Sequence, residues 1–227
     1  DSGFDQERET DEKGEISLPY VLRGSYCVQE VQAPFGYWID EDQREAVQFM
    51  VDDQGLIGLK GQSNARTGSE GMSDARTGSE EQGEARSESL TIECTNAPIR
   101  ISTKAESEAG TRYGGISDTV TITDTVEYHG CTPGQTYTLS GELHVAIVDD
   151  GGNTIDGGTL EDASGNALVS QTTFVPDAYE GMQEVTFTVD GEYLSGATVV
   201  VFEKLSCDDA ALAEHADITD KGQTVYF

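Results

Sequence analysis

The sequence predicts an all-β protein made of two tandem β-sandwich domains. Apolar residues recur at every second position in several short stretches, which is the period of a half-buried strand. Turn sequences rich in Gly, Asp and Asn separate these stretches, and hardly any stretch shows helical periodicity. The length of 227 residues suits one large domain or two of ordinary size.

The strand pattern is clearest in the second half of the chain. The stretch VTITDTVEY places alternate residues on one face and threonines on the other, and YTLSGELHVAIV, EVTFTVD and ATVVVFEKL continue this period. The turn sequences TPGQ, DDGGN, DASGN and DGEY separate these strands. Short strands spaced by turns predict an immunoglobulin-like sandwich. We expect DDAALAEHA to be a loop with at most one helical turn.

The first half has fewer predicted strands and contains an internal repeat. GEISLPYVLRGSYCVQEVQAPFGYW, REAVQFMVD and LTIECTN have strand character. The repeated stretches SNARTGSEGM and SDARTGSEEQ lack aromatic and β-branched apolar residues, so we expect a disordered insertion at about 62–88, either a solvated spacer or a ligand-binding loop. The sequence NAPIR marks the expected boundary between domains 1–97 and 98–227.

The composition excludes several kinds of partner. With 13 Lys and Arg against 43 Asp and Glu, the net charge is −30, which repels nucleic-acid phosphates and anionic lipids. No apolar run is long enough to span a membrane, so we expect no membrane insertion in this segment. Because no signal peptide opens the sequence, we expect a piece of a longer chain.

Four cysteines divide evenly between the two halves of the chain. No CxxC pair or His/Cys cluster indicates zinc, and we expect no metal or other cofactor. An even number of cysteines in an acidic chain rich in Gly and Thr favours extracellular disulfides, and four buried thiols are the alternative. The expected pairs are Cys27–Cys94 and Cys131–Cys207.

Two Asp- and Gly-rich stretches, VDDGGNTIDGG and LEDASGN, allow two interpretations. They could bind calcium or form hairpin loops. They lack the EF-hand pattern with its terminal glutamate, so hairpin loops are the favoured interpretation.

Two acids stand on predicted apolar faces. Asp124 alternates with the apolar residues of VTITDTVEY, and Glu203 lies within the apolar run VVVFEKL. A buried carboxylate is costly unless it is protonated, paired or hydrogen-bonded. Two such acids close together would share one proton and could polarise an amide carbonyl. The alternatives are solvent-facing acids at a strand edge, or the paired carboxylates of a hydrolase in an open cleft.

Three spaced motifs resemble those of a known family. DTVEYHGCTPGQTYTLSGEL, VPDAYEGMQEVTFTVDGEYLSGATVVVFEKL and EHADITDKGQTVYF resemble the VaFE repeat, the Thr–Gln ester-bond domain of Gram-positive surface proteins, over about residues 99–227. In that family, a threonine on the first strand attacks the side-chain amide of a glutamine on the last strand. Ammonia leaves, and an internal ester remains.

The resemblance implies which two residues react. ISTKA is similar to the family's opening Ile-Gly-Thr-Thr-Ala, which implies that Thr103 is the nucleophile. KGQTV implies that Gln223 is the acceptor. The sequence departs from the family at Ser102, where glycine is usual, and at Cys131, where leucine is typical. Neither departure changes a reacting group.

The resemblance also implies four supporting residues. Glu203 is the acid of VVFE, and Asp124 is the acid of DTVEY. His215 lies eight positions before the glutamine and is suited to act as the base, although a lone histidine there would be an ordinary loop residue. Asp220 occupies a recurrent acidic position.

The first half resembles a second family. GEISLPYVLRGSYCVQEVQAPFGYW is similar to the end of a collagen-adhesin B-type (SpaA-like pilin) domain, a prealbumin-like sandwich that commonly forms a Lys–Asn isopeptide bond. This resemblance implies that Glu30 promotes the bond and that Asn96 accepts it. Neither Lys13, in a turn, nor Lys60, after the motif, fits the donor position.

Together these observations predict a stalk module of a cell-wall-anchored surface adhesin or pilin. It would be extracellular, its anchor would lie outside this segment, and its partners would be neighbouring stalk domains of the same chain. It would not be an enzyme, because the self-cross-linking reaction runs only once. The alternatives are an adhesin module that binds a host surface or matrix ligand, and the carboxylate-pair hydrolase.

Overall fold

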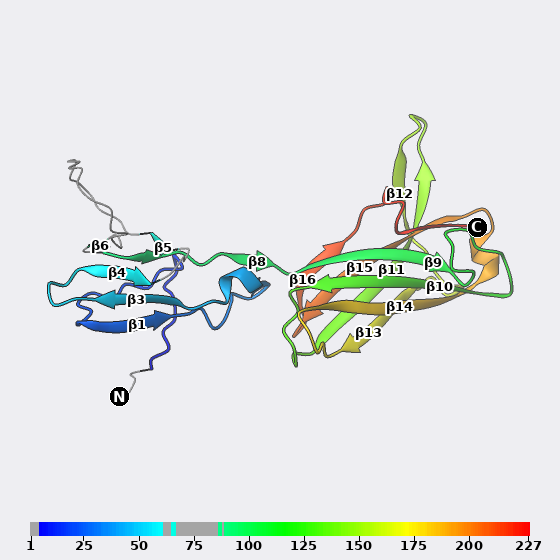
Figure 1. Ribbon diagram of the computed structural model, residues 1–227. Coiled ribbons are helices and arrows are strands. Elements are labelled where there is room, and N and C mark those ends of the chain that lie inside the picture. The colour runs from blue at the N-terminus through cyan, green and yellow to red at the C-terminus, as the bar shows by residue number, and fades with distance from the viewer. Residues whose placement is uncertain (1–4, 61–64, 67–85, 88) are drawn as a thin grey trace. The chain divides into compact units, whose positions relative to one another are not determined.

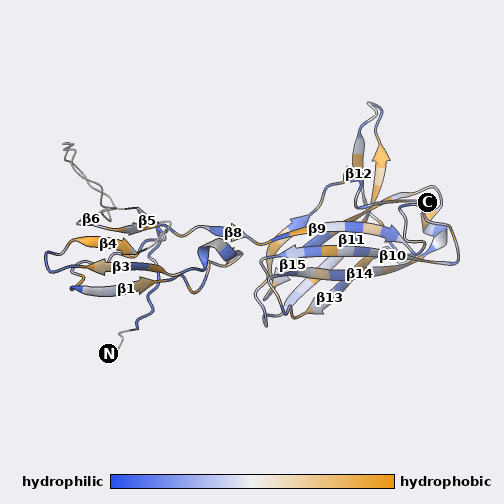
Figure 2. Cartoon of the chain, viewed as in Figure 1, coloured by the Kyte–Doolittle hydropathy of each residue, from blue (hydrophilic) through white to orange (hydrophobic). Residues whose placement is uncertain are grey.

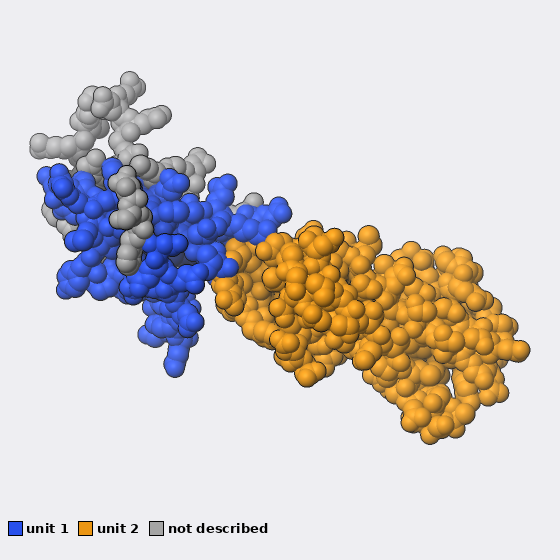
Figure 3. Space-filling model, turned by 90° about the horizontal axis from the view of Figure 1, so that it is seen from below, with its two compact units in different colours: residues 1–31, 41–95 blue, residues 32–40, 96–227 orange. Residues whose placement is uncertain are grey.

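The computed structural model describes residues 5–60, 65–66, 86–87 and 89–227. These residues form 17 β-strands and the 3₁₀ helices η1 (Glu41–Gln43) and η2 (Gly191–Leu194), which confirms the predicted all-β class. Within this part of the chain, no helix is long and apolar enough to cross a membrane. The chain divides by its contacts into a first unit, residues 1–31 with 41–95, and a second unit, residues 32–40 with 96–227 (Figure 3).

The first unit contains a small antiparallel sheet (Figure 1). Alternate residues of the strand Val47–Val51 point inward, as the burial of Phe49 and Val51 shows. Tyr26 stacks on Phe49 with ring centroids 5.2 Å apart. Most of the insertion expected at about 62–88 lies outside the described residues. The sheet order is β1 (Gly24–Val28), β3 (Val47–Val51), β4 (Ile57–Lys60) and β6 (Arg86–Ser87), and β5 (Ala65–Arg66) pairs with β7 (Thr91–Ile92).

The second unit is a sandwich of two antiparallel sheets. The first sheet has the order β14 (Glu180–Asp190), β10 (Thr119–His129) and β9 (Arg100–Ser107). The second has the order β12 (Thr154–Thr159), β11 (Tyr137–Val148), β15 (Thr198–Cys207) and β16 (Ala210–His215). In addition, β13 (Val169–Phe174) pairs with β11, and β17 (Thr224–Tyr226) pairs with β15.

The two sheets enclose one apolar core. Every second residue of β10 from Val120 to Tyr128 is buried, as the sequence period predicts, and Asp124 is among them. The alternation of apolar and polar residues along the strands is visible in Figure 2. Burying a valine or leucine side chain contributes about 1.5–3 kcal/mol, so this core is the main source of the unit's stability. From β14 and β15 it includes Val185, Phe187, Val189, Val199, Val201 and Leu205.

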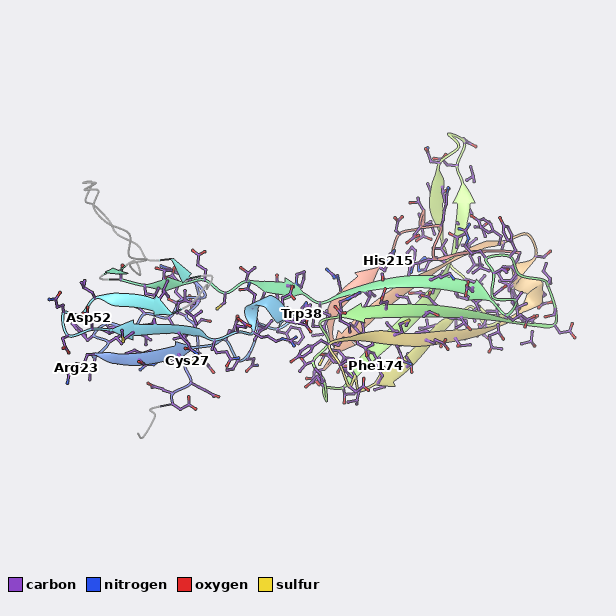
Figure 4. All side chains as sticks on the ribbon, viewed as in Figure 1. Arg23, Cys27, Trp38, Asp52, Phe174 and His215 are labelled. Carbon is purple, nitrogen blue, oxygen red and sulfur yellow. The ribbon has the colours of Figure 1, made fainter. Side chains whose placement is uncertain are left out.

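Residues 32–40 belong to the second unit although they precede most of the first. Their strand β2 (Tyr37–Ile39) pairs with β8 (Asn96–Pro98), just before β9. Trp38, labelled in Figure 4, is 8% exposed, stacks on Tyr179 and lies directly over Gly130. This stretch falls within the domain 1–97 expected from the sequence, whereas its contacts in the structure are with the sandwich that follows.

The stretch DDAALAEHA differs from its prediction. We expected a loop, and allowed one helical turn in it because alanine, leucine and glutamate favour helices. In the structure Ala210–His215 is strand β16, which pairs with β15 in a register that places His215 opposite Glu203. Pairing with a long buried strand outweighs the local helix propensity here, as tertiary context often does.

The Asp- and Gly-rich stretches form turns, as expected. Asp149 lies between β11 and β12, and its carboxylate accepts hydrogen bonds from the backbone N–H groups of Gly151 and Asn153. Asp162 accepts from Ser164 and Asn166 in the same way. The β11–β12 hairpin extends away from the sandwich in Figure 1. In the described part of the chain, no group of three or more His, Cys, Asp or Glu side chains is arranged to hold a metal ion.

Candidate functional site

The structure brings Thr103 and Gln223 together although 120 positions separate them. Thr103 lies in β9, the edge strand of one sheet, and Gln223 directly precedes β17, which belongs to the other sheet. The Nε2 atom of Gln223 donates a hydrogen bond of 2.6 Å to the Oγ1 atom of Thr103. The glutamine side chain is fully buried, so water has no direct access to its amide.

The backbone fixes the position of Gln223 from both sheets. The N–H of Val201 in β15 donates to the carbonyl of Gln223 at 3.1 Å. The N–H of Ala105 in β9 donates to the carbonyl of Gly222 at 3.0 Å. This short segment therefore bridges the two sheets at the point where the two side chains meet.

Two buried acids lie next to this pair. Asp124 pairs with Ala105 across β10 and β9, and Thr103 is the diagonal neighbour on the same face. Glu203 projects into the core from β15. The exposed fractions are 0% for Asp124 and 1% for Glu203, so neither acid faces solvent at a strand edge.

Burial changes the acidity of both groups. Burial raises the pKa of Asp124 to about 6, although the neighbouring Glu203 and Thr103 side chains partly offset this effect. Burial and the nearby charge of Asp124 raise the pKa of Glu203 to about 9. Because each carboxyl group affects the pKa of the other, the two titrate as a pair, and burial disfavours the ionised form of both.

Several polar atoms of the site are buried without an ordinary hydrogen bond. Within the described residues, neither the carboxyl oxygens of Asp124 and Glu203 nor the Oε1 atom of Gln223 receives one. The Thr103 hydroxyl lies near enough to Asp124 to lower the pKa of that carboxyl without reaching full hydrogen-bond geometry. An unsatisfied buried acceptor costs about 1–3 kcal/mol, so this cluster is unfavourable for stability alone.

His215 and Asp220 form a second pair beside the acids. The Nε2 atom of His215 lies 2.8 Å from the Oδ2 atom of Asp220, and the side chains are 26% and 29% exposed. The Oδ1 atom of Asp220 accepts from the N–H of Gly222 at 2.6 Å, which ties this pair to the Gln223 segment. His215, labelled in Figure 4, does not hydrogen-bond Thr103, and its charge lowers the pKa of Asp124.

The residues implied for an isopeptide bond lie in different units. Glu30 is a half-buried residue of the first unit, whereas Asn96 belongs to β8 of the second unit. Lys13 is exposed in a turn held by Asp11, and Lys60 ends β4. The roles of Glu30 and Asn96 stay predictions.

All four cysteines are thiols in the structure. Cys131 and Cys207 are buried in the same core, and burial, together with the neighbouring Cys207, raises the pKa of Cys131 to about 12. Cys27 and Cys94 are exposed, and burial and the nearby Glu30 raise the pKa of Cys94. Both expected pairings stay predictions.

One residue that contacts the site was missed by the sequence analysis. Gly141 of β11 lies directly opposite Glu203, and the Glu203 carboxyl rests against its α-carbon. The available signal was a glycine inside the predicted strand YTLSGELHVAIV, where it breaks the alternating pattern.

Comparisons with known families agree with both resemblances. A family model described as the T-Q ester bond containing domain matches residues 99–227, more than half of the chain, and the chain therefore belongs to this family. The model of the SpaA prealbumin-like fold domain matches residues 2–65. Both family assignments made from the motifs are confirmed. No curated protein was found to match the chain.

Solved structures with some similarity include a bacterial adhesin from Mobiluncus mulieris, described as containing intramolecular disulfide, isopeptide and ester bond cross-links. Its two crystal forms show 18% and 19% sequence identity, with TM-scores of 0.43 and 0.41. Each match covers 56% of this chain and 56% of the adhesin chain. A Bacteroides fragilis protein described as a "putative beta-galactosidase" has 11% identity and a TM-score of 0.34, over 52% of this chain and 17% of its own.

Proposed function

We propose that this chain is a structural stalk segment of an extracellular, cell-wall-anchored adhesin or pilin, stabilised by an autocatalytic ester between Thr103 and Gln223. The observation that carries this proposal is the 2.6 Å contact between the threonine hydroxyl and the glutamine amide, which lies beside two acids that are buried in the core. Membership in the ester-bond family supports the same conclusion.

The reaction joins two side chains of one molecule. The Oγ1 atom of Thr103 attacks the side-chain carbonyl carbon of Gln223, the C–N bond of the amide breaks, and ammonia leaves. The hydroxyl proton departs with the ammonia, so no other reactant is needed. Holding the groups in contact replaces a bimolecular encounter, an effect that can supply about 7–11 kcal/mol of the barrier.

The acid pair would perform the proton transfers. Ionised Asp124 lies nearest the Thr103 hydroxyl and would accept its proton. Protonated Glu203 would supply the proton that stabilises the charge developing on the Gln223 carbonyl oxygen, an atom that lacks a donor in the resting site. Burial serves this chemistry twice, because it keeps Glu203 protonated and keeps water from hydrolysing the ester.

His215 would assist at the half-exposed side of the site. Its hydrogen bond to Asp220 orients the imidazole, and its charge favours the ionised form of Asp124. We assign it the transfer of protons between the buried acids and solvent. This role differs from that of general base to the Thr103 hydroxyl, which we expected from the sequence, because the hydrogen bond of His215 goes to Asp220.

The ester would connect the two sheets of the sandwich. Thr103 belongs to the edge strand of one sheet, and the backbone of Gln223 is hydrogen-bonded to β15 of the other. A force that pulls on the first and last strands would then pass through a covalent bond instead of the hydrogen-bonded core. A stalk that holds a binding region away from the cell would gain resistance to unfolding and proteolysis.

The alternative function, a hydrolase that uses Asp124 and Glu203 as paired carboxylates, is not supported by the burial of these acids. That alternative requires an open cleft around Asp124 and Glu203, where a substrate could reach them. Both side chains are sealed in the core, at 0% and 1% exposed. Residues 63–88, the candidate for direct ligand binding, are almost all outside the described part of the chain.

The intact mass of the purified chain tests the proposal. We expect the wild-type mass to be lower than the sequence mass by one ammonia. Thr103→Ala and the isosteric Gln223→Glu should both abolish this loss. A folded wild-type protein with the full sequence mass would overturn the proposed reaction.

A further inference from the structure

Gly141 occupies a position where glycine is normally unfavourable. It lies in the middle of β11, paired with Glu203 of β15 on one side and with Ser170 of β13 on the other. Glycine inside a strand adds flexibility to the unfolded chain and packs nothing. Its φ angle is not among the positive values of the chain, so the backbone conformation does not require glycine. The reason must be the space beside it.

That space is filled by two side chains of the core. A Cβ atom at position 141 would collide with the Oε1 atom of Glu203 and would lie 2.6 Å from the Cζ atom of Phe187. Residues directly opposite each other in an antiparallel pair point to the same face, so the Glu203 side chain lies over the Gly141 α-carbon. Phe187 of β14 pairs with Ile122, two positions from Asp124.

We propose that Gly141 is a positioning residue for ester formation. Because it has no side chain, it leaves the space in which the Glu203 carboxyl lies next to Asp124. The inference rests on the proposed function. Any side chain at this position would push the carboxyl away, since Phe187 closes the other side and a packed core has no void to take up the displacement. The Glu203 carboxyl would then move away from Asp124, and the acid pair would separate.

The test compares two alanine variants in the otherwise intact chain. Gly141→Ala introduces the clash at the site. Gly181→Ala is the matched control: it lies in a strand of the same sandwich, without a positive φ angle, and its Cβ would collide with the Tyr128 hydroxyl, four residues along β10 from Asp124. Each chain is produced by cell-free translation, and intact mass is followed over time after synthesis. Thermal unfolding monitors the fold.

We expect Gly141→Ala to lose ammonia about 100-fold more slowly than wild type, the size of effect that a 1 Å displacement of a reacting group can have. Gly181→Ala should react at nearly the wild-type rate despite a similar loss of stability. The pH profile of the reaction gives a second readout, which a loss of packing alone would not change. The titratable groups beside Glu203 are Asp124, which faces it, and His215, which pairs with it from β16. Separating Glu203 from Asp124 should shift the alkaline limit of the reaction to lower pH.

A further variant keeps the test valid if Gly141→Ala folds poorly. The double variant Gly141→Ala/Phe187→Leu relieves the collision with the Phe187 ring but still displaces the Glu203 carboxyl. Phe187→Leu alone is its control. We expect the double variant to fold and to react slowly. A folded Gly141→Ala or double variant that reacts as fast as its control would overturn this inference alone. Absence of ammonia loss in wild type would instead overturn the proposed function.

Discussion

The two units differ in how deeply they bury their candidate catalytic acids. In the described residues, Phe49 and Val51 are the only buried large apolar side chains of the first unit, whereas a continuous core runs through the second. Accordingly Glu30 is half-buried, while Asp124 and Glu203 are sealed from solvent. The comparison teaches that a self-cross-linking site depends on its surroundings as much as on its motif. Burial in a core raises the pKa of a carboxyl group, because it disfavours the charged form.

The largest expected effect comes from removing the acid nearest the nucleophile. Asp124→Asn should abolish ammonia loss or slow it at least about 100-fold, because the amide cannot accept the Thr103 proton. Intact mass over several days measures this. Asp118→Asn, an exposed acid just before β10, is the control and should react normally. Full cross-linking of Asp124→Asn would remove the acid pair from the mechanism.

The next effect concerns stability. Thr103→Ala should lower the free energy of unfolding of the second unit by roughly 5 kcal/mol, by analogy with a disulfide that closes a loop of similar length. Denaturant unfolding followed by Trp38 fluorescence reports on this unit, because Trp38 packs against its sandwich. Thr125→Ala, a half-buried threonine of β10 outside the site, is the control. Equal free energies of unfolding for the two variants would mean that the ester does not stabilise the fold.

The uncross-linked Thr103→Ala protein should also show a characteristic pH dependence. The folded chain holds the Glu203 proton up to a pKa of about 9, whereas the unfolded chain releases it near the ordinary value of 4.5. The folded state therefore binds more protons between these limits, and the free energy of unfolding should fall as pH rises from 4.5 to about 9. Adding Glu203→Gln should flatten this slope. An unchanged slope would show that Glu203 is not the group that titrates.

How far the sequence predicts this site depends on the residue. Alternation in β10 places Asp124 on the same face as apolar residues, because a strand has a strict period of two. Glu203 lies within an apolar run, and the structure resolves its burial in favour of the core over a solvent-facing strand edge. The pairing partner of a strand is not encoded so locally. Strand β16 was missed because its composition favours a helix, and the assignment of residues 32–40 to the second unit depends on Trp38 packing beside Gly130. Gly141 was missed because its role is the space it leaves, which only the packed structure reveals.

The smallest expected effect is a difference in thiol reactivity between the cysteines of the two units. After reduction, a thiol reagent at pH 8 should label Cys27 and Cys94 in the folded protein, because they are exposed, but not Cys131 and Cys207, which are buried. Burial raises the pKa of Cys131 to about 12, so little reactive thiolate forms. Labelling after unfolding, with and without prior reduction, then distinguishes buried thiols from the predicted disulfides. Rapid labelling of Cys131 in the folded protein would contradict the closed core.

The most direct test of the central claim is fragmentation of the cross-linked peptide from a digest of the wild-type protein. We predict one branched species in which the peptide containing Thr103 is joined to the peptide containing Gln223, with one ammonia missing and with cleavage by hydroxylamine, which attacks esters. Recovery of the two peptides only as separate, unmodified species from folded protein would contradict the account.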